Sequence, residues 1–389
     1  MLSQYEALPH RGRLVTIAMI VCISAAITCF GLLALLRADQ LYGESQRFER
    51  QLVWILISWP AMFAVTRIPY RSIRPFSFVF YVLCVVLLVV TLFMPPVYGA
   101  RRWIPLGLLD FQPSEPARLS VILALAFYLM HRDHHRTVLG LIAPMIMTFV
   151  PLLLVLKEPD LGTAMLFLPV LYAMLFAAGA KTKHLLAATT MGILMLPGLW
   201  WQMSAEQKSR VVTVFTQNDG GTAPAGDGFH LHQSKQVISL GGPLGSITHD
   251  EPIIDDPAAW QLPAARTDFI FSIIAERFGI PGCAILLTLY MMLLLVGLHV
   301  ARQTQEPWGR LVAVGIVTMI ATQVVINTGM TVGLMPITGI TLPLCSYGGS
   351  SLLSTCISLG LLINIAMRPG YEVTGEPFAF GISSTRSLS

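Results

Sequence analysis

The chain has 389 residues, of which 54% are hydrophobic and only 12% are charged. Together with a mean hydropathy of +0.68, this composition excludes a soluble globular protein, a disordered chain and a disulfide scaffold, and it predicts a polytopic membrane protein. The net charge of +4 is too small to indicate a nucleic acid among its partners.

Apolar runs between charged or turn-rich breaks predict ten spans, because a helix needs roughly 20 apolar residues to cross a bilayer. In chain order they are 14–36, 51–67, 76–96, 114–130, 138–156, 160–179, 183–203, 269–301, 309–335 and 346–367. We expect a break in the eighth between Gly279 and Gly282. The predicted fold class is all-α: a polytopic integral membrane protein with about ten transmembrane helices and one large extracytoplasmic loop.

The first apolar run is too long for the core of a signal peptide, so we interpret it as an uncleaved first span. The expected organisation is a cytoplasmic N-terminus (1–13), helices 1 to 7 (14–203), a large polar extracytoplasmic loop (204–267), helices 8 to 10 (268–367) and a cytoplasmic tail (368–389).

Lys and Arg in short loops predict the orientation, because cytoplasmic loops carry an excess of them. With the N-terminus inside, the inner side holds twelve: Arg11, Arg13, Arg67, Arg71, Arg74, Arg132, Arg136, Lys181, Lys183, Arg302, Arg310 and Arg368. The short outer loops hold five: Arg37, Arg47, Arg50, Arg101 and Arg102. Both termini are therefore predicted to be cytoplasmic, and the loop 204–267 faces outward.

Two charged residues open the fourth predicted span. Glu115 and Arg118 stand three residues apart, so they share a face of a helix that Pro113 or Ser114 could start. Charges at membrane depth cost a few kcal/mol or more and need a reason to be there. We interpret the pair either as a structural ion pair that orients the span or as a substrate-facing site.

Two further charged segments lie on the predicted outer side. Lys157, Glu158 and Asp160 form a tight turn that is either solvated or the mouth of a cavity. Thr267 and Asp268 precede the eighth span, where one of them could cap the helix. Alternatively, Asp268 is suitably located to act as a general base on a lipid-anchored molecule.

The segment between the last two spans is rich in Gly, Pro and hydroxyl residues from Asn327 to Ser351. Such a composition predicts an irregular or re-entrant segment, which membrane proteins tolerate only where protein or water satisfies the backbone. Close packing of small residues is the alternative explanation.

Other signals are weaker. His131, Asp133, His134 and His135 resemble a metal cluster, but a solvated basic turn is the favoured interpretation. The six cysteines form no C-x-x-C pattern, and no phosphate-binding loop is present. Neither a cysteine metal site nor a nucleotide-driven pump is therefore expected.

Six motifs stand in a recognisable order: residues 99–107, 111–115, 158–163, 233–234 with 241–242, 267–271 with Glu276, and 343–351. Together they resemble the SEDS family of bacterial cell-wall glycosyltransferases, which includes RodA, FtsW and SpoVE. The resemblance covers nearly the whole chain. Residues 327–339 are more similar to RodA than to FtsW, which favours a role in cell elongation and shape over division.

The resemblance implies polymerisation of lipid II into β-1,4-linked glycan at the outer face of the bacterial cytoplasmic membrane. Asp268 stands at the position of the acid that the family requires for catalysis. An unperturbed Asp has a pKa of about 3.9, so it is ionised at neutral pH but weakly basic. The implied partners are a class B penicillin-binding protein, which is a transpeptidase, and other membrane proteins of the elongation complex.

The diphosphate leaving group of such a reaction needs cations nearby. The candidates are Arg102, Lys157, Arg210, Lys235 and Arg266. Arg102 and Arg210 are favoured because the family resemblance implies basic residues there. Other predicted substrate-binding residues are Trp103, Asp160, Gln233 and Ser234. A divalent cation, Mg or Mn, could share the task, and acidic residues such as Glu158 or Asp160 could hold it. No coordination pattern settles this, and no other cofactor is expected.

The chain departs from the family pattern around the predicted site. Arg118 replaces a common Lys, Glu158 a common Gln and Arg266 a common His. The loop 239–266 also differs, which puts the acceptor path and the partner contacts in doubt. Two functions compete with the polymerase: a transporter that flips a lipid-linked precursor, and a scaffold that only recruits partners.

Overall fold

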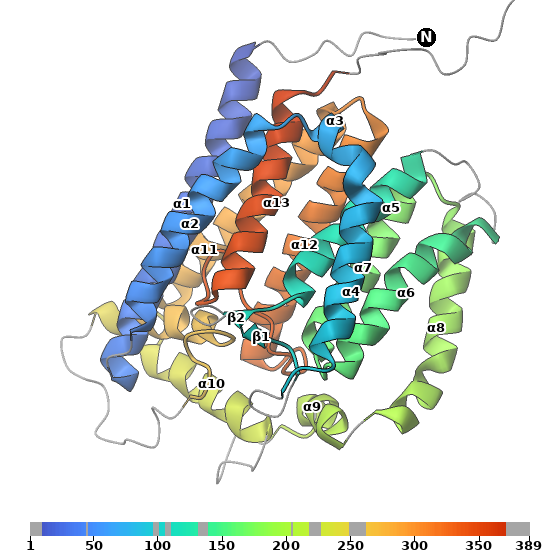
Figure 1. Cartoon of the computed structure of the whole chain (residues 1–389). Coiled ribbons are helices and arrows are strands. Elements are labelled where there is room, and N and C mark those ends of the chain that lie inside the picture. Colours follow the sequence, from blue (N-terminus) through green and yellow to red (C-terminus); the bar gives the residue numbers. More distant parts are fainter. Residues whose placement is uncertain are drawn as a thin grey trace, which may run out of the picture.

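The computed structural model describes residues 10–43, 46–95, 101–105, 110–130, 139–203, 205–217, 227–248 and 262–370. This part of the chain is almost entirely helical and forms a bundle of long helices with one short β-ribbon at an end (Figure 1). The histidine-rich segment 131–138 and the segments 218–226 and 249–261 of the predicted loop 204–267 lie outside the described residues.

The long helices are α1 (His10–Tyr42), α2 (Arg47–Arg67), α4 (Ser77–Thr91), α5 (Ser114–Met130), α6 (Ile142–Lys157), α7 (Leu161–Ala177), α8 (Thr182–Gln202), α11 (Ile270–Gln303), α12 (Pro307–Val332) and α13 (Gly349–Met367). The shorter helices are α3 (Tyr70–Ile73), α9 (Ala205–Phe215) and α10 (Asp227–Gly241), with 3-10 turns η1 (Arg74–Phe76), η3 (Leu139–Leu141) and η4 (Ser246–Thr248). Strands β1 (Ile104–Pro105) and β2 (Asp110–Phe111) pair antiparallel, with Ile104 opposite Phe111.

Each of the ten predicted intervals contains one long helix, which confirms the all-α membrane fold class. Among the described residues, six helical stretches are long and apolar enough to cross a membrane: Arg11–Tyr42, Tyr70–Thr91, Leu139–Lys157, Ile270–Gln303, Pro307–Val332 and Gly349–Met367. Helix α7 is apolar but shorter. The exact number of ten spans therefore stays a prediction.

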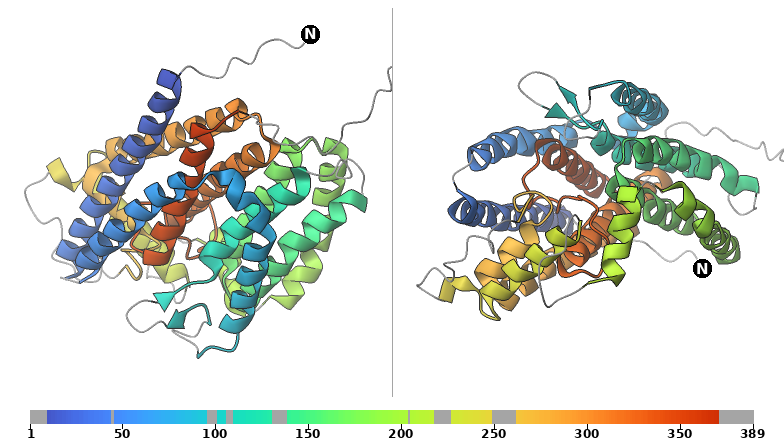
Figure 2. Two further views of the ribbon diagram at one scale, coloured as in Figure 1. Left: turned by 45° about the horizontal axis from the view of Figure 1, so that its top comes forward. Right: turned by 90° about the horizontal axis from the view of Figure 1, so that it is seen from below.

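The helices form two neighbouring groups that meet at α12 and α13. Helix α13 lies along α2, α1 lies along α11, and α12 packs against α11, α7 and α5 (Figures 1 and 2). Helix α1 begins and α13 ends at the same end of the bundle, while the β-ribbon, α9 and α10 lie at the opposite end. We call this second end the α10 end.

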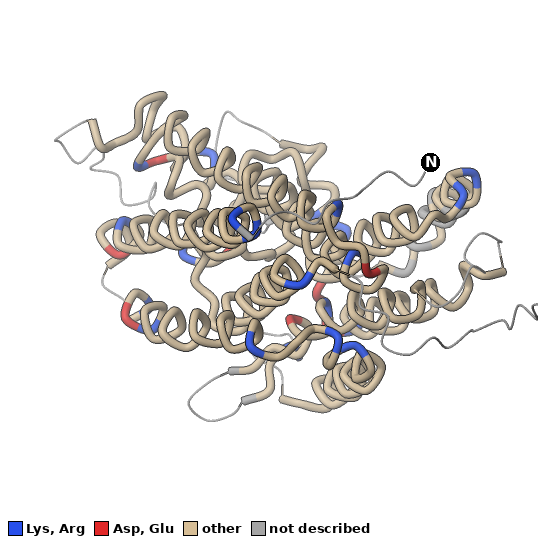
Figure 3. The backbone as a smooth tube through the Cα atoms, turned by 90° about the horizontal axis from the view of Figure 1, so that it is seen from above, with Lys and Arg blue, Asp and Glu red and all other residues tan. Residues whose placement is uncertain are grey.

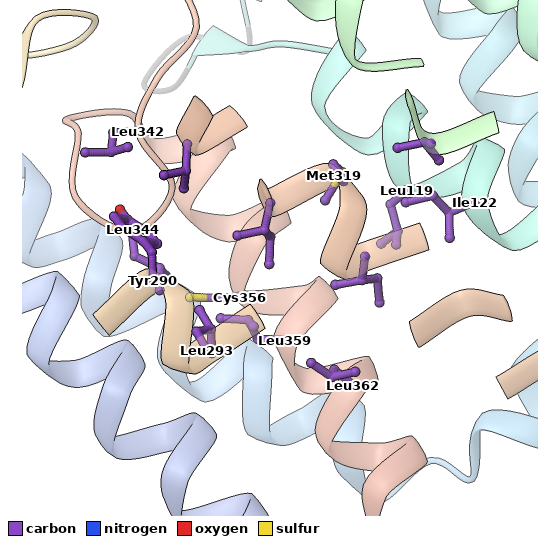
Figure 4. Packing of buried hydrophobic residues seen from close by; sticks show 14 of the residues in the cluster. Leu119, Ile122, Tyr290, Leu293, Met319, Leu342, Leu344, Cys356, Leu359 and Leu362 are labelled. Atoms are coloured by element: carbon purple, nitrogen blue, oxygen red, sulfur yellow. The ribbon is translucent and has the colours of Figure 1, made fainter. Parts of the chain in front are cut away.

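Apolar side chains fill the centre of the bundle and also cover much of its outside. Leu119, Ile122, Met319 and Leu359 pack in the buried cluster between α5, α12 and α13 (Figure 4). Many large apolar side chains on the outer helix faces are exposed, such as Leu56. Helices that are apolar on all sides suit a lipid environment. Accordingly, Figure 3 shows long stretches of helix without charged residues.

Helix α11 is interrupted, as the sequence predicted. Gly279 has φ 62° and ψ −156°, and Pro281 follows within the same helix. The N–H of Ile280 donates instead to the carbonyl of Pro243, at 3.0 Å. A Cβ on Gly279 would lie 2.5 Å from the backbone of Gly245, so only glycine permits this close approach. The break thus joins the segment after α10 to the first half of α11.

Candidate functional site

Asp268 lies in a tight turn at the α10 end, just before α11. The N–H groups of Thr267, Asp268 and Phe269 all donate to the carbonyl of Ala264, at 3.1, 3.1 and 3.2 Å. Phe269 is the N-cap residue of α11, and no side chain caps the helix. The interpretation of Thr267 or Asp268 as a helix cap is therefore wrong. The Asp268 side chain stays partly exposed.

The surroundings of Asp268 change its acidity. The pKa of its carboxyl is raised to about 6, chiefly by burial and in part by the negative charge of Asp160. The Thr267 side chain and the positive charges of Arg102 and Arg210 lower it. The four charged residues, which the sequence analysis assigned to one site, therefore act on one another in the folded chain.

Asp160 caps helix α7. Its Oδ1 accepts from the Thr163 N–H at 3.1 Å, and its Oδ2 accepts from the Thr163 hydroxyl at 2.9 Å and from Gln112 Nε2 at 3.4 Å. Asp160 is buried, and so is Glu158. A solvated turn is thus the wrong explanation for this segment. The Asp-x-x-Thr spacing was the sequence signal that could have identified the cap.

Arg102 is attached to the same turn from the start of the β-ribbon. Its Nε donates to the Glu158 carbonyl at 3.0 Å, and its Nη2 donates to the Pro159 carbonyl. These two bonds fix one edge of the guanidinium. The contacts join the segment before β1 to the connection between α6 and α7.

Glu158 is fully buried beside this arginine contact. Within the described residues, neither of its carboxylate oxygens has a hydrogen-bond partner. The pKa of Glu158 is raised to about 8, chiefly by burial and in part by the charge of Asp160, while the nearby Thr91 hydroxyl and Arg102 limit the rise. Glu158 is therefore largely protonated at neutral pH.

The other predicted cations differ in their contacts. Arg210 is half-buried on α9. Lys235 on α10 donates to Gln217 Oε1 at 2.6 Å, and Lys157 is exposed at the end of α6. Arg266 donates to Asp39 Oδ1 at 2.8 Å and to the Gly43 carbonyl at 2.7 Å. Arg266 is thus anchored to the end of α1.

The remaining predicted substrate-binding residues lie on two elements. Trp103 is half-buried beside Arg102. Gln233 and Ser234 are buried on α10, and the Gln233 Oε1 has no partner within the described residues. The Ser234 hydroxyl lies 2.7 Å from the Ser272 hydroxyl and donates to the Thr331 carbonyl at 2.8 Å. Ser234 therefore joins α10, α11 and α12.

Glu115 and Arg118 form an ion pair at the start of α5, and both are buried. Helix α5 begins at Ser114, one of the two starts that the sequence allowed.

Residues 333–348 contain no regular helix, as predicted, although Asn327 itself belongs to α12. A Cβ on Gly162 would lie 2.5 Å from the Thr338 carbonyl, so this irregular segment packs directly on the start of α7.

The site does not offer the ligands of a divalent cation. No group of three or more His, Cys, Asp or Glu side chains suitable for a metal occurs in the described part of the chain. Both oxygens of Asp160 already accept bonds from Thr163, and Glu158 is buried and protonated. These two carboxylates therefore do not fit a bound divalent cation.

These features define a polytopic helical membrane protein with a carboxylate and arginine site at one end of its bundle. The sequence model of the FtsW, RodA and SpoVE family, described as cell cycle protein, matches residues 13–370, and the chain belongs to this family. The family resemblance inferred from the motifs is thereby confirmed.

Curated relatives cover most of the chain. They include the probable peptidoglycan glycosyltransferase FtsW of Geobacter sulfurreducens, 32% identical over 90% of this chain and 95% of that protein. Stage V sporulation protein E of Bacillus subtilis is 34% identical over 92% and 95%. Peptidoglycan glycosyltransferase MrdB of Escherichia coli is 33% identical over 82% and 85%.

Solved structures have the same fold. A chain from a peptidoglycan synthase complex, studied for its coordination of polymerization and crosslinking, aligns with a TM-score of 0.77 and 31% identity over 90% of this chain and 96% of that one. The rod shape determining protein RodA of Thermus thermophilus aligns with a TM-score of 0.67 and 28% identity over 91% and 97%.

Proposed function

We propose that this chain is a peptidoglycan glycosyltransferase that polymerises lipid II into β-1,4-linked glycan strands at the outer face of the bacterial cytoplasmic membrane. Its family membership and its relatives support this function. The observation that carries the proposal is the partly exposed Asp268, whose pKa of about 6 responds to burial and to the charges of Asp160, Arg102 and Arg210.

Asp268 is the proposed general base. A pKa of about 6 makes it a stronger base than an ordinary Asp while leaving it mostly ionised at neutral pH. The acceptor 4-hydroxyl oxygen forms a bond to the anomeric carbon of the donor, and its proton passes to Asp268. At the same time the bond from that carbon to the pyrophosphate oxygen breaks, and undecaprenyl pyrophosphate leaves with the electron pair.

Arg102 and Arg210 are proposed to stabilise the charge that develops on the leaving diphosphate. The carbonyls of Glu158 and Pro159 hold one edge of the Arg102 guanidinium, so that its orientation is set before the substrate binds. Trp103, Lys157, Asp160, Gln233 and Ser234 remain proposed substrate-binding residues.

The test is polymerisation of labelled lipid II by the purified chain. We expect Asp268→Asn to slow the reaction about 100-fold or more, the usual contribution of a general base. Glu49→Gln is the matched control, because Glu49 is an exposed carboxylate at the start of α2. If Asp268→Asn polymerises lipid II as fast as the parent, the assignment of Asp268 is wrong.

The same protein in vesicles tests the transporter alternative. A parent chain that makes no glycan but moves labelled lipid II across the bilayer would identify a flippase. A scaffold is distinguished in cells, because it would complement growth when it carries Asp268→Asn, whereas the polymerase would not.

We propose that both termini are cytoplasmic and that loop 204–267 is extracytoplasmic. The start of α1 and the end of α13 lie at the same end of the bundle, and the predicted inner side carries the excess of Lys and Arg. Reporter fusions at residues 1 and 389 check this orientation. An active periplasmic reporter at either terminus would contradict it.

We further propose that the chain serves elongation and works beside a class B penicillin-binding protein. The similarity of residues 327–339 to RodA supports elongation, while FtsW relatives at similar identity keep division as the alternative. The likeness to a synthase complex supports the partner. Depletion in cells separates the two roles, since loss of an elongation enzyme rounds the cells and loss of a division enzyme leaves filaments.

A further inference from the structure

Three consecutive backbone carbonyls, ending at Asp268, each accept a hydrogen bond from the C-terminal part of the chain. The Arg266 carbonyl accepts from the Tyr347 N–H at 3.0 Å, the Thr267 carbonyl from the Ser346 hydroxyl, and the Asp268 carbonyl from Asn327 Nδ2 at 2.8 Å. We call these three donors the carbonyl clamp. Because Asp268 lies outside the regular hydrogen bonds of α11, the clamp supplements the turn at Ala264 in fixing its backbone.

Asn327 holds two segments at once. It is fully buried on α12, and its amide nitrogen also donates to the Ile340 carbonyl at 2.6 Å. Both amide hydrogens are therefore used, one on Asp268 and one on the irregular segment 333–348. The amide sets the separation between these two pieces of backbone.

The irregular segment in turn lies against the Asp268 carboxyl. A Cβ built on Gly339 would be 3.5 Å from Asp268 Oδ2, and Gly339 has a φ of +74°. The neighbouring Thr338 carbonyl meets the start of α7 at Gly162, two residues after Asp160. Asn327 thus fixes the distance between the carboxyl of Asp268 and the segment that separates it from α7.

We infer that Asn327 is a positioning residue for the Asp268 carboxylate, acting through the Asp268 backbone and segment 333–348 without touching the substrate. This inference rests on the proposed function. Small displacements of a catalytic group reduce turnover strongly, whereas substrate affinity depends on other contacts. Loss of the Asn327 amide should therefore lower kcat more than it changes KM.

The chain contains a matched control. Asn364 on α13 is also fully buried, and its Nδ2 donates to the carbonyls of Val65 and Ile68, at 2.7 and 2.6 Å. These carbonyls lie at the end of α2, at the opposite end of the bundle from Asp268. Asn327→Leu and Asn364→Leu each remove two bonds from a buried amide to backbone carbonyls, and Asn364→Leu also removes the bond that Arg368 donates to Asn364 Oδ1. The control therefore loses at least as many bonds, but only Asn327 concerns the site.

The experiment measures lipid II polymerisation and thermal stability for the full chain and its variants. We expect Asn327→Leu to lower kcat about 10- to 100-fold with KM within about twofold of the parent. We expect Asn364→Leu to lose comparable thermal stability while its kcat per folded molecule stays within about twofold. Ser346→Ala is the milder second variant, with a smaller fall in kcat.

Equal losses of kcat in Asn327→Leu and Asn364→Leu would overturn the inference, because they would show a general loss of structure. Parent-like kcat in folded Asn327→Leu or, if that variant does not fold, in Ser346→Ala would do the same. Asp268→Asn in the same assay separates this outcome from failure of the proposed function. Parent-like activity of Asp268→Asn would overturn the assignment of Asp268 as the base, whereas an inactive Asp268→Asn beside clamp variants with parent-like kcat would overturn only the positioning role of Asn327. A parent chain that makes no glycan would overturn the proposed function itself.

Discussion

Asp160 and Asp268 belong to one electrostatic unit although they come from different parts of the chain. The pKa of Asp268 is raised to about 6, chiefly by burial and in part by the charge of Asp160. Asp160 is itself fixed by the Thr163 N–H and hydroxyl at the start of α7. A change at Asp160 should therefore be read out in the pH dependence of a reaction that needs ionised Asp268.

The first prediction concerns Asp160→Asn, which keeps a capping acceptor but removes the negative charge. Without that charge the pKa of Asp268 falls, so the base stays ionised to lower pH. We expect the acid limb of the pH–activity profile to move down from about 6, with roughly a twofold gain in relative activity at pH 5. Initial rates of glycan synthesis between pH 4.5 and 8 measure this, and an unchanged or raised limb would count against the coupling.

Arg210→Gln should move the acid limb of the pH–activity profile to higher pH. The positive charge of Arg210 lowers the pKa of Asp268, so its removal lets that pKa rise. We also expect kcat to fall about 10-fold because the leaving diphosphate loses a cation. The pH series used for Asp160→Asn measures both effects. Arg277 lies on α11 and is not among the groups that shift the pKa of Asp268, so Arg277→Gln is the control. An identical profile in both variants would contradict a role for Arg210.

Glu158→Gln should stabilise the protein above neutral pH. The folded pKa of about 8 exceeds the value of an exposed Glu, so the folded state holds a proton that the unfolded state has already released. The contribution of Glu158 to the stability of the parent is therefore complete below about pH 4.3, the pKa of an exposed Glu. It is lost progressively as the pH rises to about 8.

The neutral amide of Glu158→Gln removes this dependence. We expect a gain of about 1–3 kcal/mol at pH 8.5 and almost none at pH 5. Thermal unfolding of the detergent-solubilised protein at the two pH values checks the difference. If the stability of the parent rises between pH 5 and 8 while that of the variant does not change, Glu158 is not protonated in the folded protein.

The buried pair of Glu115 and Arg118 should show strong coupling. Removing one partner leaves a buried charge alone, which typically costs about 3–5 kcal/mol, whereas replacing both with apolar residues costs much less. We expect Glu115→Leu and Arg118→Met each to be less stable than the double variant. A double-mutant cycle of unfolding midpoints measures the coupling, and simple additivity would argue against it.

Much of the fold was predictable because its determinants are local. The length of each apolar run identified the ten helical intervals, and Gly279 with Pro281 indicated the break in α11. The irregular segment after α12 was visible from its Gly and Pro content. The motifs also grouped Asp268, Asp160 and Arg102, and in the structure the charges of Asp160 and Arg102 act on Asp268.

The role of each side chain was harder to predict from the sequence. Asp268 does not cap α11, and the segment with Glu158 and Asp160 is not a solvated turn. Arg266 was a candidate cation for the substrate, but it binds Asp39 at the end of α1. Arg266 and Asp39 are 227 residues apart in the chain, and Arg102 reaches the Glu158 carbonyl across 56 residues, so no local pattern reveals these contacts.

Composition, run length and motif order predict a helical membrane protein of the cell-wall polymerase family without any knowledge of packing. The raised pKa of Asp268, the protonation of Glu158 and the bonds from Asn327 to the Asp268 and Ile340 carbonyls arise only in the folded chain. The reason is physical: desolvation, charge coupling and hydrogen bonds between distant segments exist only once the helices have packed.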